Sequence, residues 1–341
     1  MSTSGKAAVL PAAPALRATA ARSGLASERW RPAEIAFWVV VLLAMFAFPG
    51  YRVLGSQILI TALFALSLDL ILGYAGIVSL GHAAFFGLGA YAAGLLAVHG
   101  WGEPITGLLA GGAVAMLFGF LVSFIVVRGN DLTRLMVTLG IGLMLYEAAN
   151  KASFLTGGVD GLSGVVTWKL LGMFEFGLVG TVAYLYSLAV LFICFVVLRR
   201  LVHSPFGLSL RGLREGPWRM PALGASVLRM QVKVFTISAG VAGIAGALLA
   251  QTTQFVGLEA LGFTRSAEVL IMLVLGGTGR LYGALVGTAV FMIAQDYLAG
   301  IDPVYWQFWI GLLLVVIVMF ARGGILGGIE TLVARMRGRA R

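Results

Sequence analysis

Residues 55–99 read GSQILITALFALSLDLILGYAGIVSLGHAAFFGLGAYAAGLLAVH, two apolar stretches separated by a glycine-containing interruption. Each stretch approaches the length of about 20 mostly apolar residues that a helix needs to cross a bilayer. The interruption at 73–82 contains Gly73, Gly76 and Gly81. Unwound backbone at membrane depth is tolerated only where protein or a water-filled cavity satisfies its polar groups. The stretch therefore predicts a membrane protein with an interrupted, enclosed helix.

The composition of the whole chain supports this class. Of 341 residues, 60% are hydrophobic and 11% are charged, whereas soluble domains carry about 25% charged residues. The mean hydropathy is +0.99. These values exclude a soluble enzyme, a secreted disulfide scaffold and a disordered chain. The single cysteine, Cys194, excludes an intrachain disulfide.

Apolar stretches recur along the chain at intervals that predict about ten membrane spans. They are 34–50, 55–73, 82–99, 104–127, 135–152, 177–198, 234–254, 266–279, 281–299 and 304–321. Only glycine-rich sequence separates 266–279 from 281–299, so that boundary is weak. We expect an all-α polytopic membrane protein with ten transmembrane helices, or with eight or nine if one stretch is re-entrant.

Basic residues indicate the topology. The 24 Lys and Arg residues outnumber the 14 Asp and Glu residues and gather in 1–32, 199–233 and 322–341. Positive charge beside membrane spans marks the cytoplasmic side, and ten spans place all three segments there. A nucleic-acid partner is not expected, because the chain has no basic, aromatic-rich soluble module.

The expected organisation follows from these spans and charges. It comprises a disordered cytoplasmic tail at 1–32, a transmembrane domain at 33–322 with a cytoplasmic loop at 199–233 and a periplasmic loop at 153–176, and a basic cytoplasmic tail at 323–341.

A second glycine-rich interruption, LGGTGRLYG, occupies residues 275–283. Paired broken segments in the two halves of a chain point to the substrate site of a transporter. Spans two to five and seven to ten would run in opposite directions, so an inverted repeat is possible.

Few ionisable residues lie in or near the spans. A carboxylate at the centre of a membrane helix costs about 2.5–3.5 kcal/mol, which makes each one a functional candidate. Alternatively, those within a turn or two of a span end reach water. The residues are Asp69, His82, Glu147, Glu268 and Asp296.

Several kinds of chemistry have no matching motif. No G-x-x-x-x-G-K-[ST] loop for nucleotide phosphates is present. One cysteine and the scattered His82, His99 and His203 form no metal-ligand pattern. We therefore expect no bound metal, no cofactor and no enzymatic activity in this chain.

The loop at 199–233 contains RGLREGPWRMPALG at 211–224. Exposed Trp and Arg side chains are common anchors of protein–protein contacts. The alternative interpretation is an ordinary positively charged cytoplasmic loop.

Four sequence blocks, in order, resemble the permeases of branched-chain amino acid ABC transporters, and most closely their M-type subunit. They are LGYAGIVSLGHAAFFGLGAY at 72–91, TGGVDGL at 156–162, the segment 211–224, and FTISAGVAG at 235–243 followed by SAEVLIMLVLGG at 266–277. The resemblance covers about residues 55–322.

The resemblance implies partners: a second, homologous permease, two cytoplasmic ATPase subunits and a periplasmic substrate-binding protein. It implies a multi-pass protein of the bacterial inner membrane that moves branched-chain or other hydrophobic amino acids by alternating access.

The candidate site residues fall into three groups. Translocation-pathway candidates are Asp69, Tyr74, Ser79, His82, Phe85, Phe86, Glu268, Gly276 and Gly277. ATPase-coupling candidates are Arg211, Arg214, Glu215, Trp218, Leu223 and Gly224. Candidates in the periplasmic loop are Thr156, Gly157, Gly158 and Asp160.

Two features depart from the family pattern in the coupling segment. Pro217 and Pro221 stand where the family usually has helix formers. Because proline kinks a helix interior, we expect either a shorter coupling helix, starting at Pro217, or a different docking angle.

Alternative functions remain open at this point. The same kind of importer could carry urea, short amides or aromatic acids, since selectivity resides mostly in the binding protein. An ion-coupled secondary transporter using Asp69 and a membrane-embedded enzyme are further alternatives. The loop at 211–224 favours the importer, because a secondary transporter has no need for it.

Overall fold

The computed structural model describes residues 32–169, 180–303, 305–320 and 324–328. The tails expected at 1–32 and 323–341 lie almost wholly outside these residues, as does part of the loop expected at 153–176. The chain divides into two compact units, Met1–Ala44 and Met45–Arg341. The described residues of the first unit belong to one helix, α2 (Pro32–Ala47), whose last turn enters the second unit.

Every predicted span contains a helix. Besides α2, they are α3 (Arg52–Asp69), α4 (Ala83–Val98), α5 (Pro104–Val126), α6 (Asp131–Lys151), α8 (Thr181–His203), α10 (Val227–Thr253), α11 (Phe263–Gly276), α12 (Leu281–Ile301) and α13 (Trp306–Phe320). Among the described residues, six helical segments are long and apolar enough to cross a membrane, and α2 and α4 are shorter apolar helices. No named strand occurs in the described part of the chain. The predicted all-α polytopic class is therefore confirmed.

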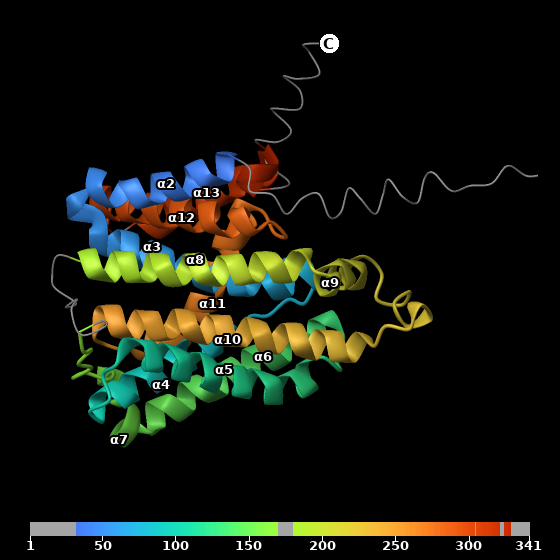
Figure 1. Cartoon of the computed structure of the whole chain (residues 1–341), viewed down its shortest axis with the longest axis horizontal. Helices are drawn as coiled ribbons and strands as arrows, with labels where there is room; N and C mark the ends of the chain where they lie inside the picture. Colours follow the sequence, from blue (N-terminus) through green and yellow to red (C-terminus); the bar gives the residue numbers. More distant parts are fainter. Residues whose placement is uncertain (1–31, 170–179, 304, 321–323, 329–341) are drawn as a thin grey trace, which may run out of the picture. The chain divides into compact units, whose positions relative to one another are not determined.

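Helix α3 forms the centre of the second unit. Its residues from Leu59 to Asp69 are buried, and it contacts α8, α10, α11 and α12. Figure 1 shows α3, α8 and α10 running roughly alongside one another, with α9 beyond one end of α8. The interruption at 73–82 therefore begins at the end of the most enclosed helix.

Glycine brings α4 and α10 into backbone contact. A Cβ atom at Gly246 would overlap the carbonyl oxygen of Phe86, and one at Gly89 would overlap the backbone of Gly243. In lipid, close packing through small residues replaces the hydrophobic effect as the force that associates helices. The glycine-rich composition thus has a direct structural use at this interface.

Several predicted boundaries shift. Helix α8 extends to His203 and α10 begins at Val227, so both helices continue into the range 199–233 that the sequence assigned to a loop. The connection between them contains α9 (Pro205–Glu215) and a 3₁₀ turn, η5 (Pro221–Leu223). The weak boundary near 280 is a turn at Gly277–Arg280.

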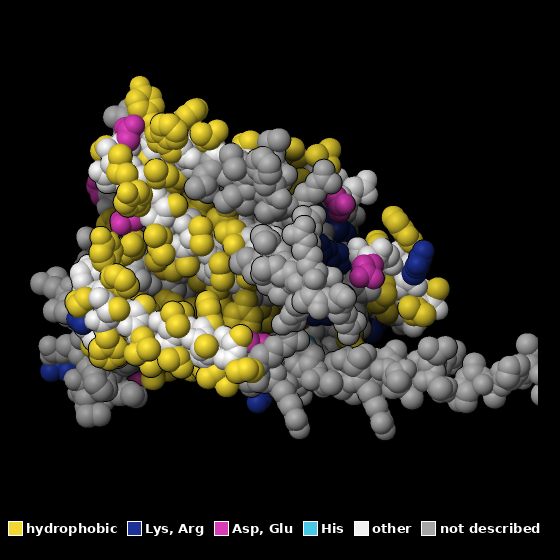
Figure 2. All heavy atoms as spheres, turned by 90° about the horizontal axis from the view of Figure 1, so that it is seen from above, with side chains coloured by type: hydrophobic (Ala, Val, Ile, Leu, Met, Phe, Trp, Pro, Cys, Tyr) yellow, Lys and Arg dark blue, Asp and Glu magenta, His cyan; other side chains and the backbone are white. Residues whose placement is uncertain are grey.

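Apolar and basic side chains occupy different parts of the surface. Figure 2 shows apolar side chains over much of the visible face, whereas several Lys and Arg side chains gather toward the end where Figure 1 places α9. The side chains of Trp218 and Leu223, which follow α9, are 82% and 78% exposed.

Candidate functional site

The first interruption begins as a π-helix, η3 (Leu70–Tyr74), directly after α3. The amide of Ile77 then donates to the carbonyl of Ile71 at 2.8 Å, and Gly76 has a φ of +71°. Single π-turns within helices occur frequently at functional sites, and the left-handed φ is one that glycine adopts without strain. The chain then runs without regular structure until α4 begins at Ala83.

The second interruption is the turn between α11 and α12. Gly277 and Gly279 have φ values of +110° and +80°. A Cβ atom at Gly276 would overlap the carbonyl oxygen of Gly283 in α12. The two helices therefore meet through their backbones, and larger residues could not close this turn.

Asp69 joins the two interruptions. Its side chain is fully buried at the end of α3, and its Oδ1 accepts a hydrogen bond from the amide of Gly279 at 2.7 Å. A Cβ atom at Gly73 would overlap the same carboxylate oxygen. The other oxygen, Oδ2, has no hydrogen-bond partner among the described residues.

Helix α9 contacts the same place from outside. Nη1 of Arg214 donates a hydrogen bond to the carbonyl oxygen of Gly73. The guanidinium of Arg211 lies 5.5 Å from the centre of the Tyr74 ring, within the range of a cation–π interaction. Two basic residues of α9 therefore hold the π-helix of the first interruption.

The local sequence explains where α9 lies. Ser204 caps its N-terminus by accepting from the amide of Gly207 at 3.5 Å, and Pro205 occupies the first turn, where no amide donor is needed. Leu210 and Leu213 form its buried face. The expected helix start at Pro217 is wrong, because the helix ends at Glu215 and both prolines follow it.

Most predicted pathway residues lie inside this chain. Tyr74, Ser79, His82, Phe85, Phe86, Gly276 and Gly277 are all buried. Their part in a translocation pathway stays a prediction. Glu268 is partly exposed and lies 3.7 Å from Arg265.

His82 packs within an aromatic cluster. Its ring stacks on Phe64 at a centroid distance of 5.5 Å and meets Phe85 edge-on at 5.6 Å. Its Nε2 lies 2.9 Å from the hydroxyl of Ser67. These contacts give His82 a packing role at the start of α4.

Other polar residues near this cluster were missed by the sequence reasoning. Ser266 accepts a hydrogen bond from the amide of Ala83 at 2.8 Å and so satisfies the start of α4. Arg265 lies 5.7 Å from the ring of Phe86 and donates to the hydroxyl of Thr61 at 3.4 Å. No local sequence pattern predicts these contacts. The position of Arg265, directly before the predicted span 266–279, is the one signal that could have indicated it.

The predicted periplasmic-loop residues form a tight turn. The hydroxyl of Thr156 donates to the carbonyl oxygens of Ala149 and Ala152 and accepts from the amide of Gly158. Gly157 and Gly158 have φ values of +77° and +59°. Asp160 ends the 3₁₀ turn η4 (Gly158–Asp160) and is exposed.

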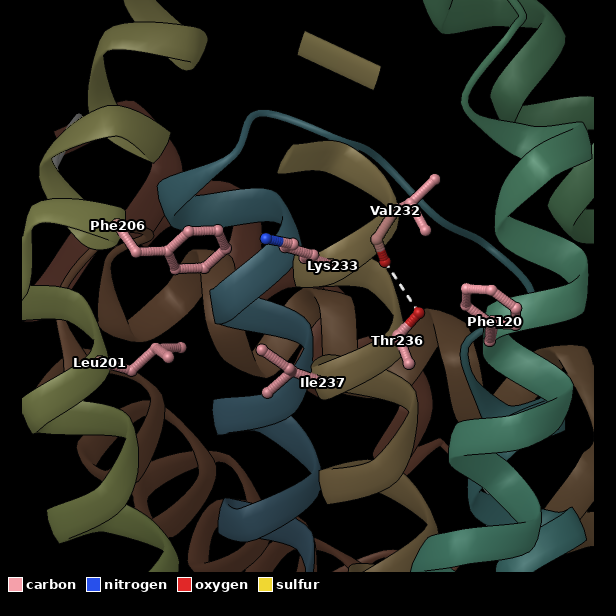
Figure 3. A pocket seen from close by; sticks show the side chains of 7 residues that line it. All are labelled: Phe120, Leu201, Phe206, Val232, Lys233, Thr236 and Ile237. Atoms are coloured by element: carbon pink, nitrogen blue, oxygen red, sulfur yellow. Dashed lines mark hydrogen bonds between the residues drawn. The ribbon is translucent and has the colours of Figure 1, made fainter. Parts of the chain in front are cut away.

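A groove of about 320 Å³ lies along α10, beside α5, α8 and α9 (Figure 3). Its lining residues are Phe120, Leu201, Phe206, Val232, Lys233, Thr236 and Ile237. The hydroxyl of Thr236 donates to the carbonyl of Val232 at 2.8 Å, the dashed line in Figure 3. Lys233 is the one charged side chain among these lining residues. No group of three His, Cys, Asp or Glu side chains that could hold a metal occurs within the described ranges.

Comparison with known proteins gives a consistent match. Residues 53–318 match the family profile described as branched-chain amino acid transport system / permease component. The chain is 30% identical to the high-affinity branched-chain amino acid transport system permease protein LivM of Escherichia coli K12, over 85% of this chain and 74% of that protein. It is 28% identical to LivM of Salmonella typhimurium LT2 (80% and 69% covered) and 24% identical to BraD of Pseudomonas aeruginosa (78% and 91% covered). No solved structure matches the chain.

Proposed function

Since the chain belongs to the family of branched-chain amino acid transport permeases and is a permease subunit of an ABC importer, we propose that it forms one half of a translocation pathway for branched-chain or other hydrophobic amino acids. It is a multi-pass membrane protein and a transport subunit rather than an enzyme. The bacterial inner membrane, with both termini in the cytoplasm, is the proposed location. Two ATPase subunits would supply the energy, and a substrate-binding protein would deliver the substrate.

The substrate class is inferred from the names of the relatives, each of which is a branched-chain amino acid permease. Phe85 and Phe86 suit an aliphatic or aromatic side chain, but both are buried against other residues of this chain. Urea, short amides and aromatic acids remain alternative substrates of the same importer.

Helix α6 is the proposed contact with the second permease. It is apolar enough to span a membrane, yet only 11% of its most apolar stretch is buried within the chain. Thr133, Met144 and Glu147 are among its exposed residues. Because a carboxylate facing lipid is unfavourable, a second permease or an aqueous pathway between the two permeases would cover this face.

The end of the molecule with α9 is the proposed ATPase-docking surface. Glu215, Trp218 and Leu223 are exposed there. Exposed aromatic residues next to charged ones are typical anchors of interfaces. Gly224, with a φ of +77°, ends the 3₁₀ turn that presents Leu223.

The turn at 156–162 is the proposed surface for the binding protein at the opposite side of the membrane. Phe154 and Val159 beside it are 90% and 83% exposed, and Asp160 is exposed as well. Apolar side chains so exposed on a rigid turn are available to a partner.

One observation carries the coupling mechanism: α9 contacts the first interruption directly through Arg214 and Arg211. Closure of the ATPases would move α9, and these contacts would pass the movement to η3. Because η3 continues α3, the central helix would tilt and open the pathway to the other side. No covalent chemistry in this chain is required.

The experiment is uptake in a bacterial strain that lacks its own branched-chain importers. The chain is co-expressed with a second permease, two ATPase subunits and a substrate-binding protein of the same kind of importer, and uptake of radiolabelled leucine, urea and benzoate is measured. We expect ATP-dependent leucine uptake that disappears when either permease is omitted. Uptake of urea or benzoate instead of leucine would overturn the substrate class, and uptake by this chain alone would overturn the importer.

A further inference from the structure

Asp69 is an unusual residue for the centre of a membrane protein. Its side chain has no solvent exposure, and a buried carboxylate is costly unless it is paired and hydrogen-bonded. One oxygen accepts the amide hydrogen of Gly279, which is 210 residues away in the chain, and the other has no hydrogen-bond partner in the described residues. A fully buried polar atom without a partner calls for an explanation.

The nearest basic side chain from α9 already reaches this location. Arg214 donates to the carbonyl of Gly73, four residues after Asp69. A Cβ atom at Gly279 would lie 2.9 Å from Nη1 of Arg214 and 3.0 Å from the carbonyl oxygen of Gly73. The guanidinium of Arg214 and the carbonyl of Gly73 therefore both lie beside Gly279, whose amide donates the hydrogen bond to Asp69.

Arg214 packs against glycines and lies beside Gly279, the hydrogen-bond partner of Asp69. Arg214 is an exposed residue whose hydrogen bond to Gly73 is partly buried, and a Cβ at Gly76 would lie 3.2 Å from its Cγ. A Cβ at Gly279 would press on the guanidinium and one at Gly76 on the stem of Arg214, whereas one at Gly73 would overlap Oδ1 of Asp69. A guanidinium has five N–H donors in a fixed fork, which match a carboxylate better than a single carbonyl.

We propose that Asp69 is a positioning residue that links both interruptions to α9, and that Arg214 exchanges the Gly73 carbonyl for the free oxygen of Asp69 when α9 moves. Because Asp69 is hydrogen-bonded to Gly279, a movement of the first interruption also moves the turn at 277–280. Helices α3 and α12 therefore move together. This inference rests on the proposed function, because it is the ATPases that move α9.

The test compares five variants in the assembled importer: Asp69→Asn, Arg214→Gln, Arg214→Lys, the double variant of Asp69→Asn with Arg214→Gln, and the control Glu259→Gln. Asparagine keeps an oxygen that accepts from Gly279 but removes the charge. Glu259→Gln removes the charge of an exposed carboxylate on the 3₁₀ turn η6 (Leu258–Leu261), to which no role is assigned. The measured quantities are the amount of assembled complex, ATP hydrolysis, and leucine taken up per ATP hydrolysed.

We expect Asp69→Asn and Arg214→Gln each to lower uptake per ATP by roughly tenfold, the size of one hydrogen bond to a charged group. The double variant should lose no more than either single variant, because the two residues act as a pair. The control should match the wild type. Arg214→Lys, which keeps the charge, should retain more uptake per ATP than Arg214→Gln.

Other outcomes would overturn the inference. An unchanged uptake per ATP in Asp69→Asn would remove the carboxylate charge from the mechanism, and additive losses in the double variant would show that the residues act separately. A parallel fall in assembly, hydrolysis and uptake would indicate a structural role alone. If Asp69→Asn does not assemble, equal losses in Arg214→Lys and Arg214→Gln would still refute the exchange. A wild-type complex that transports nothing would instead overturn the proposed function, which separates the two failures.

Discussion

The contact between α4 and α10 gives a quantitative prediction for the substitution Gly246→Ala. The new Cβ would overlap the carbonyl oxygen of Phe86 and lie 2.9 Å from the amide nitrogen of Ala90. Both atoms belong to the backbone of α4, which cannot move aside as a flexible side chain could. The two helices must therefore separate, and the contact of α4 with the rest of the core loosens.

The magnitude follows from two opposing effects. Overfilling a packed interface costs about 1–3 kcal/mol, and the overlap with backbone places this case near the upper value. Replacing glycine by alanine within a helix returns about 1 kcal/mol. We expect a net loss of about 2 kcal/mol, which lowers the melting temperature of a chain of this size by roughly 3 °C.

The assay is thermal unfolding of the purified full chain in detergent, followed by the remaining monodisperse fraction in size-exclusion chromatography. Gly140→Ala is the matched control, because Gly140 also lies in a membrane helix but has nothing within 4 Å of its Cβ position. The control should melt at the wild-type temperature or slightly above it. Equal melting temperatures for the two variants would refute the argument that backbone contact, rather than glycine content, stabilises this interface.

Three further predictions concern other parts of the chain. Gln251→Leu should destabilise the protein by about 1–3 kcal/mol in the same assay. The side-chain amide of Gln251 accepts a hydrogen bond from the hydroxyl of Tyr186 at 2.9 Å and donates one to the carbonyl of Pro104 at 2.7 Å, and leucine makes neither. An unchanged melting temperature would contradict this prediction. Trp218→Ala should leave the melting temperature unchanged but reduce the amount of ATPase that co-purifies with the importer several-fold, since the indole is exposed; full co-purification would remove it from the docking surface. Gly157→Ala should lower the free energy of unfolding by about 1–2 kcal/mol, because Gly157 has a φ of +77°, where a side chain is strained. Thermal unfolding followed by circular dichroism measures this loss, and a smaller effect would contradict the prediction.

The sequence predicted the features that depend on residues adjacent to one another along the chain. Hydropathy over about 20 residues identifies spans, and each of the ten ranges contains a helix. The glycines at 73–76 and 276–279 indicated both interruptions, because glycine adopts backbone conformations that other residues avoid. The exposed Trp218 followed from the charged loop that contains it.

The coupling helix shows where local reasoning was insufficient. Pro217 suggested a helix start, but Ser204 and Pro205 supply a better one, and the buried leucines at 210 and 213 select it by packing. Likewise, only the fold shows that His82 lies in an aromatic cluster, because Phe64 approaches it from an earlier helix.

By itself the sequence determined the membrane class, the helical segments, the positions of the interruptions and the absence of a phosphate-binding loop. Only the tertiary structure decided that Asp69 meets Gly279, that Arg214 reaches Gly73, and that Gly246 touches Phe86. The reason is physical: hydropathy and helix periodicity are properties of contiguous residues. Contacts between segments up to 210 residues apart depend on how the helices fit together, and in lipid that fit is set by side-chain shape and buried polar groups.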